Sequence, residues 1–217
     1  LLEERGFAVE EKLDAEIQLD SATLAPFSVV ILGSNNRRFS GEETRNFAKY
    51  VQNGGGAIAW SDSAFGGHWR DALGNTRGAD SDNDLFAQFG MQFLRDNGAG
   101  VFTVRRYETP HFLNKNQAEN GLAFRGEGVS AVRTTAPAQI LARLQTGETK
   151  ATLRLHPDDG ALQPNDAALS VAQIGKGRVA GVFDRNTFWN AGEGTRLSEV
   201  DNREFAARLA LWVSRRD

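Results

Sequence analysis

The sequence predicts an α/β protein with a mainly parallel central sheet and extra antiparallel strands toward its C-terminal half. Two observations carry this prediction: a strand–helix–strand pattern over residues 27–60, and an apolar helical face that begins near Asp201. A third observation is a series of short strand-like segments between them. Strands joined through a helix are expected to pair in parallel, because that connection is too long for a hairpin.

The first buried strand is expected at residues 27–33, a β-branched run typical of strands that are covered on both faces. Ser40 and Glu43 then have the spacing of a capping box, in which each side chain satisfies a backbone N–H at the start of a helix. That helix is expected to end at glycines 54–56, and a second buried strand follows at residues 57–60.

A second helix is expected from Ser81 or Asp82, with one apolar face formed by Leu85, Phe86, Phe89 and Phe93. A loop is expected over most of residues 111–125. Further strands are expected at residues 101–107, 129–132, 138–144, 151–155, 169–174 and 178–183. Gly175, Lys176 and Gly177 predict a tight hairpin turn before the last of them. The final helix carries Phe205, Leu209, Trp212 and Val213 on one face.

The N-terminal stretch predicts a sheet without its first strand. Leu1 to Arg5 is in helical register and Phe7 to Val9 looks extended, whereas a βα unit normally opens with a strand. That strand was either removed or is not part of the fold. Because no repeat, linker or low-complexity tract interrupts the sequence, residues 1–217 are expected to form one domain, as the whole protein or as a fragment of a longer chain.

Composition excludes several classes of protein. The 217 residues include no cysteine, so disulfides and thiolate metal sites are excluded. The formal charge of -3 argues against a nucleic-acid partner, which needs a basic surface. No apolar run approaches the roughly 20 residues that cross a membrane. Both a cytoplasmic and a secreted location stay open, because a signal peptide could have been lost. The oligomeric state also stays open.

Three segments together resemble the class I glutamine amidotransferase-like superfamily, and within it the ThuA-like branch named for trehalose utilisation. They are residues 27–67, with a triple glycine before a strand; residues 111–132, with the run Glu119 to Phe124; and residues 175–205. The resemblance implies a flavodoxin-like three-layer sandwich for most of the chain.

The same resemblance implies a catalytic cysteine on the turn after the strand at residues 57–60, and a histidine and a glutamate at the end of a late strand. This chain has Ser61 and Asp62 at the first place and Asp184 and Arg185 at the second. Because the thiolate nucleophile is absent, glutaminase activity is not expected.

In an open parallel sheet, ligands bind at the carboxyl ends of the strands. Three predicted loops meet there, at residues 34–38, 61–70 and 184–193. Their polar and aromatic side chains suit a polyhydroxylated ligand, with a Trp as stacking platform: Asn35, Asn36, Arg37, Ser63, Trp69, Arg185, Asn186, Trp189, Asn190 and Glu193. A carbohydrate or another polar small molecule is therefore the expected ligand. The alternative is that these residues cap helices and tighten turns.

Any catalysis is expected from Ser61, Asp62, His68 and Asp184, which supply the parts of a Ser-His-Asp hydrolase but lack its Gly-x-Ser-x-Gly turn. A carboxylate pair drawn from Asp62, Asp184 and Glu193 could instead hydrolyse a glycoside. No cofactor or metal is expected, because His68, His111 and His156 lack metal-binding spacing. A module that binds a ligand or a partner protein without chemistry is the alternative.

Overall fold

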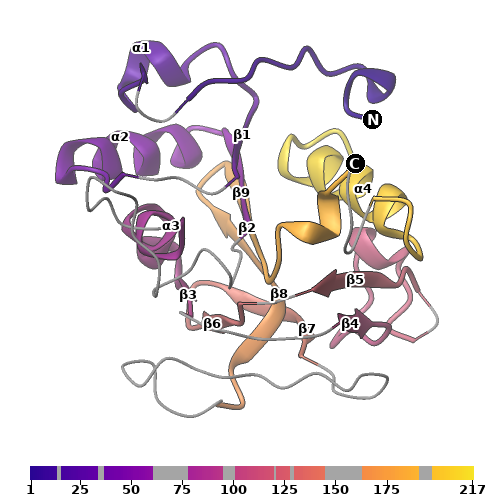
Figure 1. Ribbon diagram of the computed structural model, residues 1–217. Helices are drawn as coiled ribbons and strands as arrows, with labels where there is room; N and C mark the ends of the chain where they lie inside the picture. Colours follow the sequence, from indigo (N-terminus) through magenta and orange to yellow (C-terminus); the bar gives the residue numbers. More distant parts are fainter. Residues whose placement is uncertain are drawn as a thin grey trace.

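The computed structural model describes residues 1–13, 16–33, 37–60, 78–94, 101–119, 121–127, 130–144, 163–190 and 197–217. Among them, one large sheet lies between helices, and a two-stranded sheet lies beside it (Figure 1). The large sheet contains β1 (Val29–Leu32), β2 (Gly56–Trp60), β3 (Met91–Phe93), β6 (Val132–Thr134), β7 (Gln139–Arg143), β8 (Asp166–Ile174) and β9 (Gly177–Val182).

The small sheet contains β4 (Val101–Val104) and β5 (Phe124–Glu127). The α-helices are α1 (Ser21–Leu24), α2 (Gly41–Gln52), α3 (Gly78–Phe86) and α4 (Asn202–Val213). Short 3-10 turns occur at η1 (Glu3–Arg5), η3 (Ala87–Phe89), η4 (Phe112–Asn114) and η6 (Asn186–Phe188).

The large sheet has the order β1-β2-β9-β8-β6-β3, with β7 also paired to β8. β1, β2 and β9 are parallel, and Ile58 on β2 lies opposite Ile31 on β1 and Ala180 on β9. The other described pairings in this sheet are antiparallel. The α/β fold and the antiparallel strands of the C-terminal half are thereby confirmed.

The parallel part of the sheet is smaller than predicted, because a tight hairpin joins β8 to β9 and makes this pair antiparallel. β8 and β9 are joined by Gly175 and Lys176, and Ile174 pairs directly with Gly177. Gly175 has a φ of 60°, a left-handed conformation that such two-residue turns require. A turn this short makes its two strands antiparallel. The predicted hairpin is confirmed, and the resulting sheet is mixed.

The two faces of the sheet bury separate apolar clusters (Figure 1). α2 and α3 cover one face with side chains that include Phe47 and Phe86, while α4 covers the other with Phe205 and Leu209. Because successive side chains of a strand point to opposite faces, Ile58 packs on the α4 side while its neighbours Ala57 and Ala59 pack on the α2 side.

Two glycines let helix backbones come close to the sheet. A Cβ on Gly177, the first residue of β9, would lie 2.1 Å from the Val51 carbonyl oxygen of α2. A Cβ on Gly56, the first residue of β2, would lie 2.4 Å from the Val213 carbonyl oxygen of α4. Only glycine fits at these two positions without movement of the backbone.

The helix predicted from Ser81 or Asp82 through Phe93 is correct in its first half only. α3 begins at Gly78 and ends at Phe86, and η3 ends at Phe89, before Gly90, which has a φ of 82°. Phe93 lies in β3, where its backbone N–H donates to Asn83 Oδ1 at 2.6 Å and its carbonyl accepts from Asn83 Nδ2 at 2.9 Å. The α3 side chain of Asn83 thus holds the chain extended, and Phe93 still reaches the same apolar cluster.

Most other predicted elements are confirmed with shifted ends. The first strand, the second strand and the final helix occur as predicted, whereas the strand expected at 129–132 lies at Val132–Thr134. The strand expected at 101–107 ends at Val104. The strand expected at 151–155 falls outside the described residues.

The predicted capping box is present and also binds the N-terminal segment. Ser40 Oγ accepts from Glu43 N at 3.2 Å, and Glu43 Oε2 accepts from Ser40 N at 2.9 Å. Arg37 Nη2 donates to Glu43 Oε1 at 2.6 Å, and the backbone N–H of Leu19 donates to the same oxygen at 3.2 Å. These hydrogen bonds, that of Arg37 first, lower the pKa of Glu43 to about 2 despite its burial.

Replacing Glu43 with glutamine should remove an acid-sensitive part of the stability. The carboxyl titrates at 4.5 in its ordinary state and at about 2 in the folded protein, so its contribution is present above pH 4.5 and is lost as the pH falls toward 2. Urea denaturation between pH 2 and 7 should therefore give a flatter stability curve for Glu43→Gln than for the wild type. Glu42→Gln, at the exposed neighbouring residue, is the control. If the unfolding free energy of Glu43→Gln depends on pH as steeply as that of the wild type, the assignment is contradicted.

Candidate functional site

The carboxyl ends of β1, β2 and β9 lie at one edge of the sheet. Leu32, Ala59 and Gly181 are neighbours in register across the three strands, so the segments that follow these strands begin at the same edge. The segment after β9, residues 183–190, is described throughout. It brings together five of the predicted site residues: Asp184, Arg185, Asn186, Trp189 and Asn190.

Asp184 is fully buried, and both of its carboxylate oxygens accept backbone hydrogen bonds. Oδ2 accepts from Glu127 N at 2.7 Å, and Oδ1 accepts from Asn186 N at 2.9 Å. Gly126 packs so closely that a Cβ there would lie 2.7 Å from Asp184 Oδ2. Asp184 therefore ties the end of β5 to the loop after β9. A catalytic role for this carboxylate stays a prediction.

The loop beyond Asp184 presents an aromatic ring at the surface. Asn186 Nδ2 donates to Glu127 O at 3.3 Å, and Trp189 N donates to Asn186 O at 3.2 Å. Trp189 is 40% exposed, and the Arg185 guanidinium lies over its ring, 5.2 Å from the centroid. We call Arg185, Trp189 and Asn190 the surface platform.

Phe188, which precedes Trp189 in the sequence, forms a stacked aromatic pair that was not predicted from the sequence. The rings of Trp60, the last residue of β2, and Phe188 are 4.4 Å apart with an interplanar angle of 27°. Phe188 also stacks on Phe205 of α4 at 6.1 Å. A Trp at the end of a buried strand, just before the ligand edge, is the sequence signal that could have identified this pair.

A hollow of about 510 Å³ adjoins the stacked pair. Its walls are mainly apolar and come from β1, β2, α4 and the N-terminal segment: Leu1, Leu2, Glu3, Val9, Glu11, Ile31, Ile58, Trp60, Phe188, Asn190, Leu197, Ala206, Leu209 and Ala210. Glu3, Glu11 and Asn190 are its polar members. The hollow has the size of a small-molecule pocket and an unusually apolar lining for a carbohydrate.

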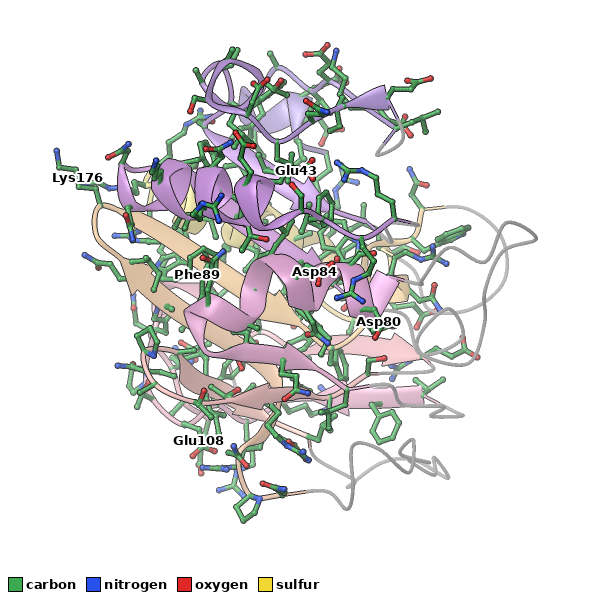
Figure 2. The ribbon with its side chains drawn as sticks, turned by 90° about the vertical axis from the view of Figure 1, so that its left-hand side faces the viewer. Glu43, Asp80, Asp84, Phe89, Glu108 and Lys176 are labelled. Carbon is green, nitrogen blue, oxygen red and sulfur yellow. The ribbon has the colours of Figure 1, made fainter. Side chains whose placement is uncertain are left out.

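Arg37, a predicted ligand-binding residue, and its neighbour Arg38 both bind carboxylates of the protein. Arg37 pairs with Glu43, and its guanidinium lies 4.4 Å from the Phe39 ring centroid. Arg38 Nε donates to Asp84 Oδ2 at 2.6 Å, and Arg38 Nη2 makes a second bond to Asp84 Oδ1. Figure 2 shows Glu43 and Asp84 on the adjacent helices α2 and α3. Binding of a ligand by Arg37 stays a prediction.

The remaining predicted site residues lie outside the described part of the chain: Asn35, Asn36, Ser61, Asp62, Ser63, His68, Trp69 and Glu193. The hydrolase and glycosidase arrangements, which depend on Asp62 and His68, therefore stay predictions. Within the described ranges, no group of three or more His, Asp or Glu side chains could hold a metal ion. None of the described helices is long and apolar enough to cross a membrane.

His111 lies far in the sequence from the loop after β9, and its contacts are typical of a residue with a structural role. Its Nδ1 accepts from Leu113 N at 3.2 Å, and its ring packs edge-on against Trp212 with centroids 5.1 Å apart. Burial, reinforced by the charge of Arg178, lowers the pKa of His111 below its ordinary value. A neutral His111 fits this capping role, because protonation of Nδ1 would remove the acceptor.

Comparisons with known proteins identify a shared fold. No protein-family model and no curated protein matches the chain. Among solved structures, the mmIFT52 N-terminal domain has a TM-score of 0.67 at 16% identity, over 98% of this chain and 88% of that one. The cytoplasmic protein STM3548 from Salmonella typhimurium has a TM-score of 0.52 at 14% identity, over 92% and 74%.

A putative ThuA-like protein from Bacteroides uniformis ATCC 8492 has a TM-score of 0.45 at 16% identity, over 90% of this chain and 72% of that one. This third structure is too distant to inform the assignment. At such identities the first two similarities concern the fold alone, so the chemistry of this chain has to be argued from its own residues.

Proposed function

We propose that this chain is a binding domain on a flavodoxin-like, amidotransferase-type scaffold, and that it takes a carbohydrate at the carboxyl edge of its sheet without hydrolysing it. The observation that carries the proposal is the exposed indole of Trp189, with the Arg185 guanidinium over its ring and the exposed Asn190 beside it in sequence. An aromatic face flanked by hydrogen-bonding groups suits the apolar face and the hydroxyl rim of a sugar ring.

The backbone of the loop that carries the surface platform supports this proposal. The hydrogen bonds of Asp184 and Asn186 hold the start of the loop, and Trp189 O accepts from Leu197 N at 2.6 Å at its other end. A ligand therefore meets a ring whose backbone is already fixed, and binding has little ordering cost to overcome.

Two features favour binding over hydrolysis. The chain has no cysteine for thiolate attack. Asp184, the catalytic candidate in the described part, is 0% exposed and has both oxygens bound to backbone N–H groups. A general acid or base has to reach the proton it transfers, and Asp184 is buried between β5 and the loop.

Trp189→Ala should weaken sugar binding. Isothermal titration of the 217-residue protein with glucose, galactose and their disaccharides should give saturable binding, and the variant should bind about ten-fold more weakly, or about 1.4 kcal/mol. Leu13→Ala is the control, because Leu13 is 59% exposed and is far from the platform in the sequence. Unchanged affinity in Trp189→Ala would move the site elsewhere, and absence of binding to all these sugars would refute the carbohydrate assignment.

A further inference from the structure

Residues 1–13 form one wall of the hollow of about 510 Å³. Leu2 and Val9 line it from this segment, together with Ile31 and Ile58 of the sheet. The segment therefore helps to enclose this volume and does not fill it. The volume lies in the range of about 300–1,000 Å³ that small-molecule pockets have.

Arginine contacts fasten this wall to α4 and to the residues that follow it. Arg5 Nη2 lies 3.0 Å from Glu204 Oε2, and Arg203 Nη2 lies 2.5 Å from Glu4 Oε2. Arg216 Nη2 donates to the carbonyl oxygen of Arg5 at 3.1 Å. Figure 1 shows the N-terminus close to α4, in agreement with these contacts. The start of the chain is thus held against the hollow by bonds at several points.

The charged residues that line the hollow are both acidic. They are Glu3 and Glu11, and both are exposed, so they lie where the hollow meets the solvent. In the described part of the chain, neither side chain has an ion pair or a hydrogen bond, whereas the adjacent Glu4 and Glu10 each form an ion pair. Two such carboxylates attract a cation and repel an anion.

The remaining walls are almost entirely apolar. Ile58 and Leu209 are buried, and the stacked rings of Trp60 and Phe188 form a further part of the lining. Asn190 is the one uncharged polar residue among the described residues that line the hollow. Burial of an apolar group against these walls is favourable, because it removes apolar surface from water.

We propose that this hollow is a binding site for a small amphipathic cation, a primary amine with an apolar body. The apolar body would lie against Ile58, Leu209 and Trp60. The ammonium group would lie at Glu3 and Glu11, which are exposed, so it would keep part of its hydration and escape the full cost of burying a charge.

Other small molecules fit this lining less well. An anion with the same apolar body would meet two carboxylates, and a neutral molecule would gain nothing from them. A sugar would place its hydroxyl groups against apolar walls, where they lose hydrogen bonds to water without replacement. Trp189 does not line the hollow, so this site goes beyond the proposed carbohydrate platform and does not rest on it.

Three probes of equal chain length test the charge selection: octylammonium, 1-octanol and octanoate. Isothermal titration of the 217-residue protein, below the concentration at which these molecules aggregate, should show saturable binding of octylammonium. Octanol should bind more weakly, and octanoate at least about ten-fold more weakly than octylammonium, since two carboxylates act on the charge. Equal affinity for all three, or no binding of octylammonium, would refute the proposal.

A charge reversal at Glu11 separates recognition of charge from damage to the site. Glu11→Lys should bind octylammonium about ten-fold more weakly and octanoate more tightly than the wild type. Glu16→Lys makes the same change of charge at an exposed residue that lines neither hollow, so it should bind both probes as the wild type does. Equal effects of the two substitutions would refute the role of Glu11.

Filling the hollow tests where the apolar body lies. Ala206 of α4 lines the hollow, so Ala206→Leu should weaken octylammonium and octanol alike, about ten-fold, because the larger side chain occupies part of the volume. Urea denaturation checks that this variant folds, and the exposed Glu11 variant serves as the test if it does not. Wild-type affinity in a folded Ala206→Leu would refute the hollow as the site.

Trp189→Ala distinguishes the two proposals. It should leave octylammonium binding unchanged, whereas sugar binding should weaken. A loss of octylammonium binding in this variant would place the amine on the surface platform and refute the hollow. Failure of sugars to bind would refute the platform proposal and leave the amine site standing.

Discussion

Asp184→Ala is expected to lower the free energy of unfolding by about 2–4 kcal/mol, because it leaves two backbone N–H groups without their acceptors. Those groups belong to Glu127 and Asn186, on two segments that Asp184 joins. Asp184→Asn keeps the shape and one acceptor oxygen but turns an NH₂ group toward one of the N–H donors. Its cost should be about half as large.

Urea denaturation measures both losses of unfolding free energy, provided that the variants and the wild type show the same dependence of this free energy on urea concentration. Glu119→Ala is the control: Glu119 pairs with Arg106 at 3.2 Å with 70% of its side chain exposed, and its loss should change stability by less than about 1 kcal/mol. Sugar affinity should fall with stability in Asp184→Ala, because the platform loop begins at Asp184. A stable variant that loses a hydrolytic activity of the wild type would instead establish the catalytic role.

Phe205→Ala is expected to cost about 3–5 kcal/mol, the range for removal of a buried phenylalanine from a close-packed core. Phe205 on α4 is 0% exposed, and its ring stacks on Phe124 of β5 with centroids 4.4 Å apart and an angle of 8°. It also stacks on Phe188, in the loop that carries the surface platform. One ring thus joins α4, the small sheet and the platform loop.

Chemical denaturation again provides the measurement, with Phe205→Leu expected to cost about 1–2 kcal/mol because it leaves a smaller cavity. Arg203→Ala, on an exposed position of the same helix, should stay within about 0.5 kcal/mol of the wild type. A cost below about 1 kcal/mol for Phe205→Ala would show that the aromatic cluster is loosely packed.

The elements that the sequence predicted well are those with a local signal. The capping box at Ser40 and Glu43 and the Gly175–Lys176 turn are each defined within a few residues, and both are present. Phe93 shows the limit of such signals: its spacing from Phe89 fits a helix face, but the side chain of Asn83 and pairing with β6 decide its conformation. The pairing with β6 in particular comes from residues distant in the sequence.

The candidate site shows the same limit. The position of Asp184 at the end of a strand is readable from the sequence, but its environment is not. Its acceptor bond to Glu127 joins residues 57 apart in the chain, and its burial depends on a glycine at 126. The stacked pair of Trp60 and Phe188 likewise forms only after β2 and β9 become neighbours. Roles that depend on such long-range contacts could not be predicted.

The glycines at 56 and 177 bear on how relatives of this chain should be recognised. At each of them, a helix carbonyl oxygen lies so close to the start of a strand that a Cβ would stand only 2.1 to 2.4 Å from it. These glycines are therefore required by the close spacing between the helices and the sheet. Any protein with the same spacing needs glycine there, whatever it binds. Similarity that is concentrated in glycines identifies the scaffold, whereas similarity in function has to be sought in the loops.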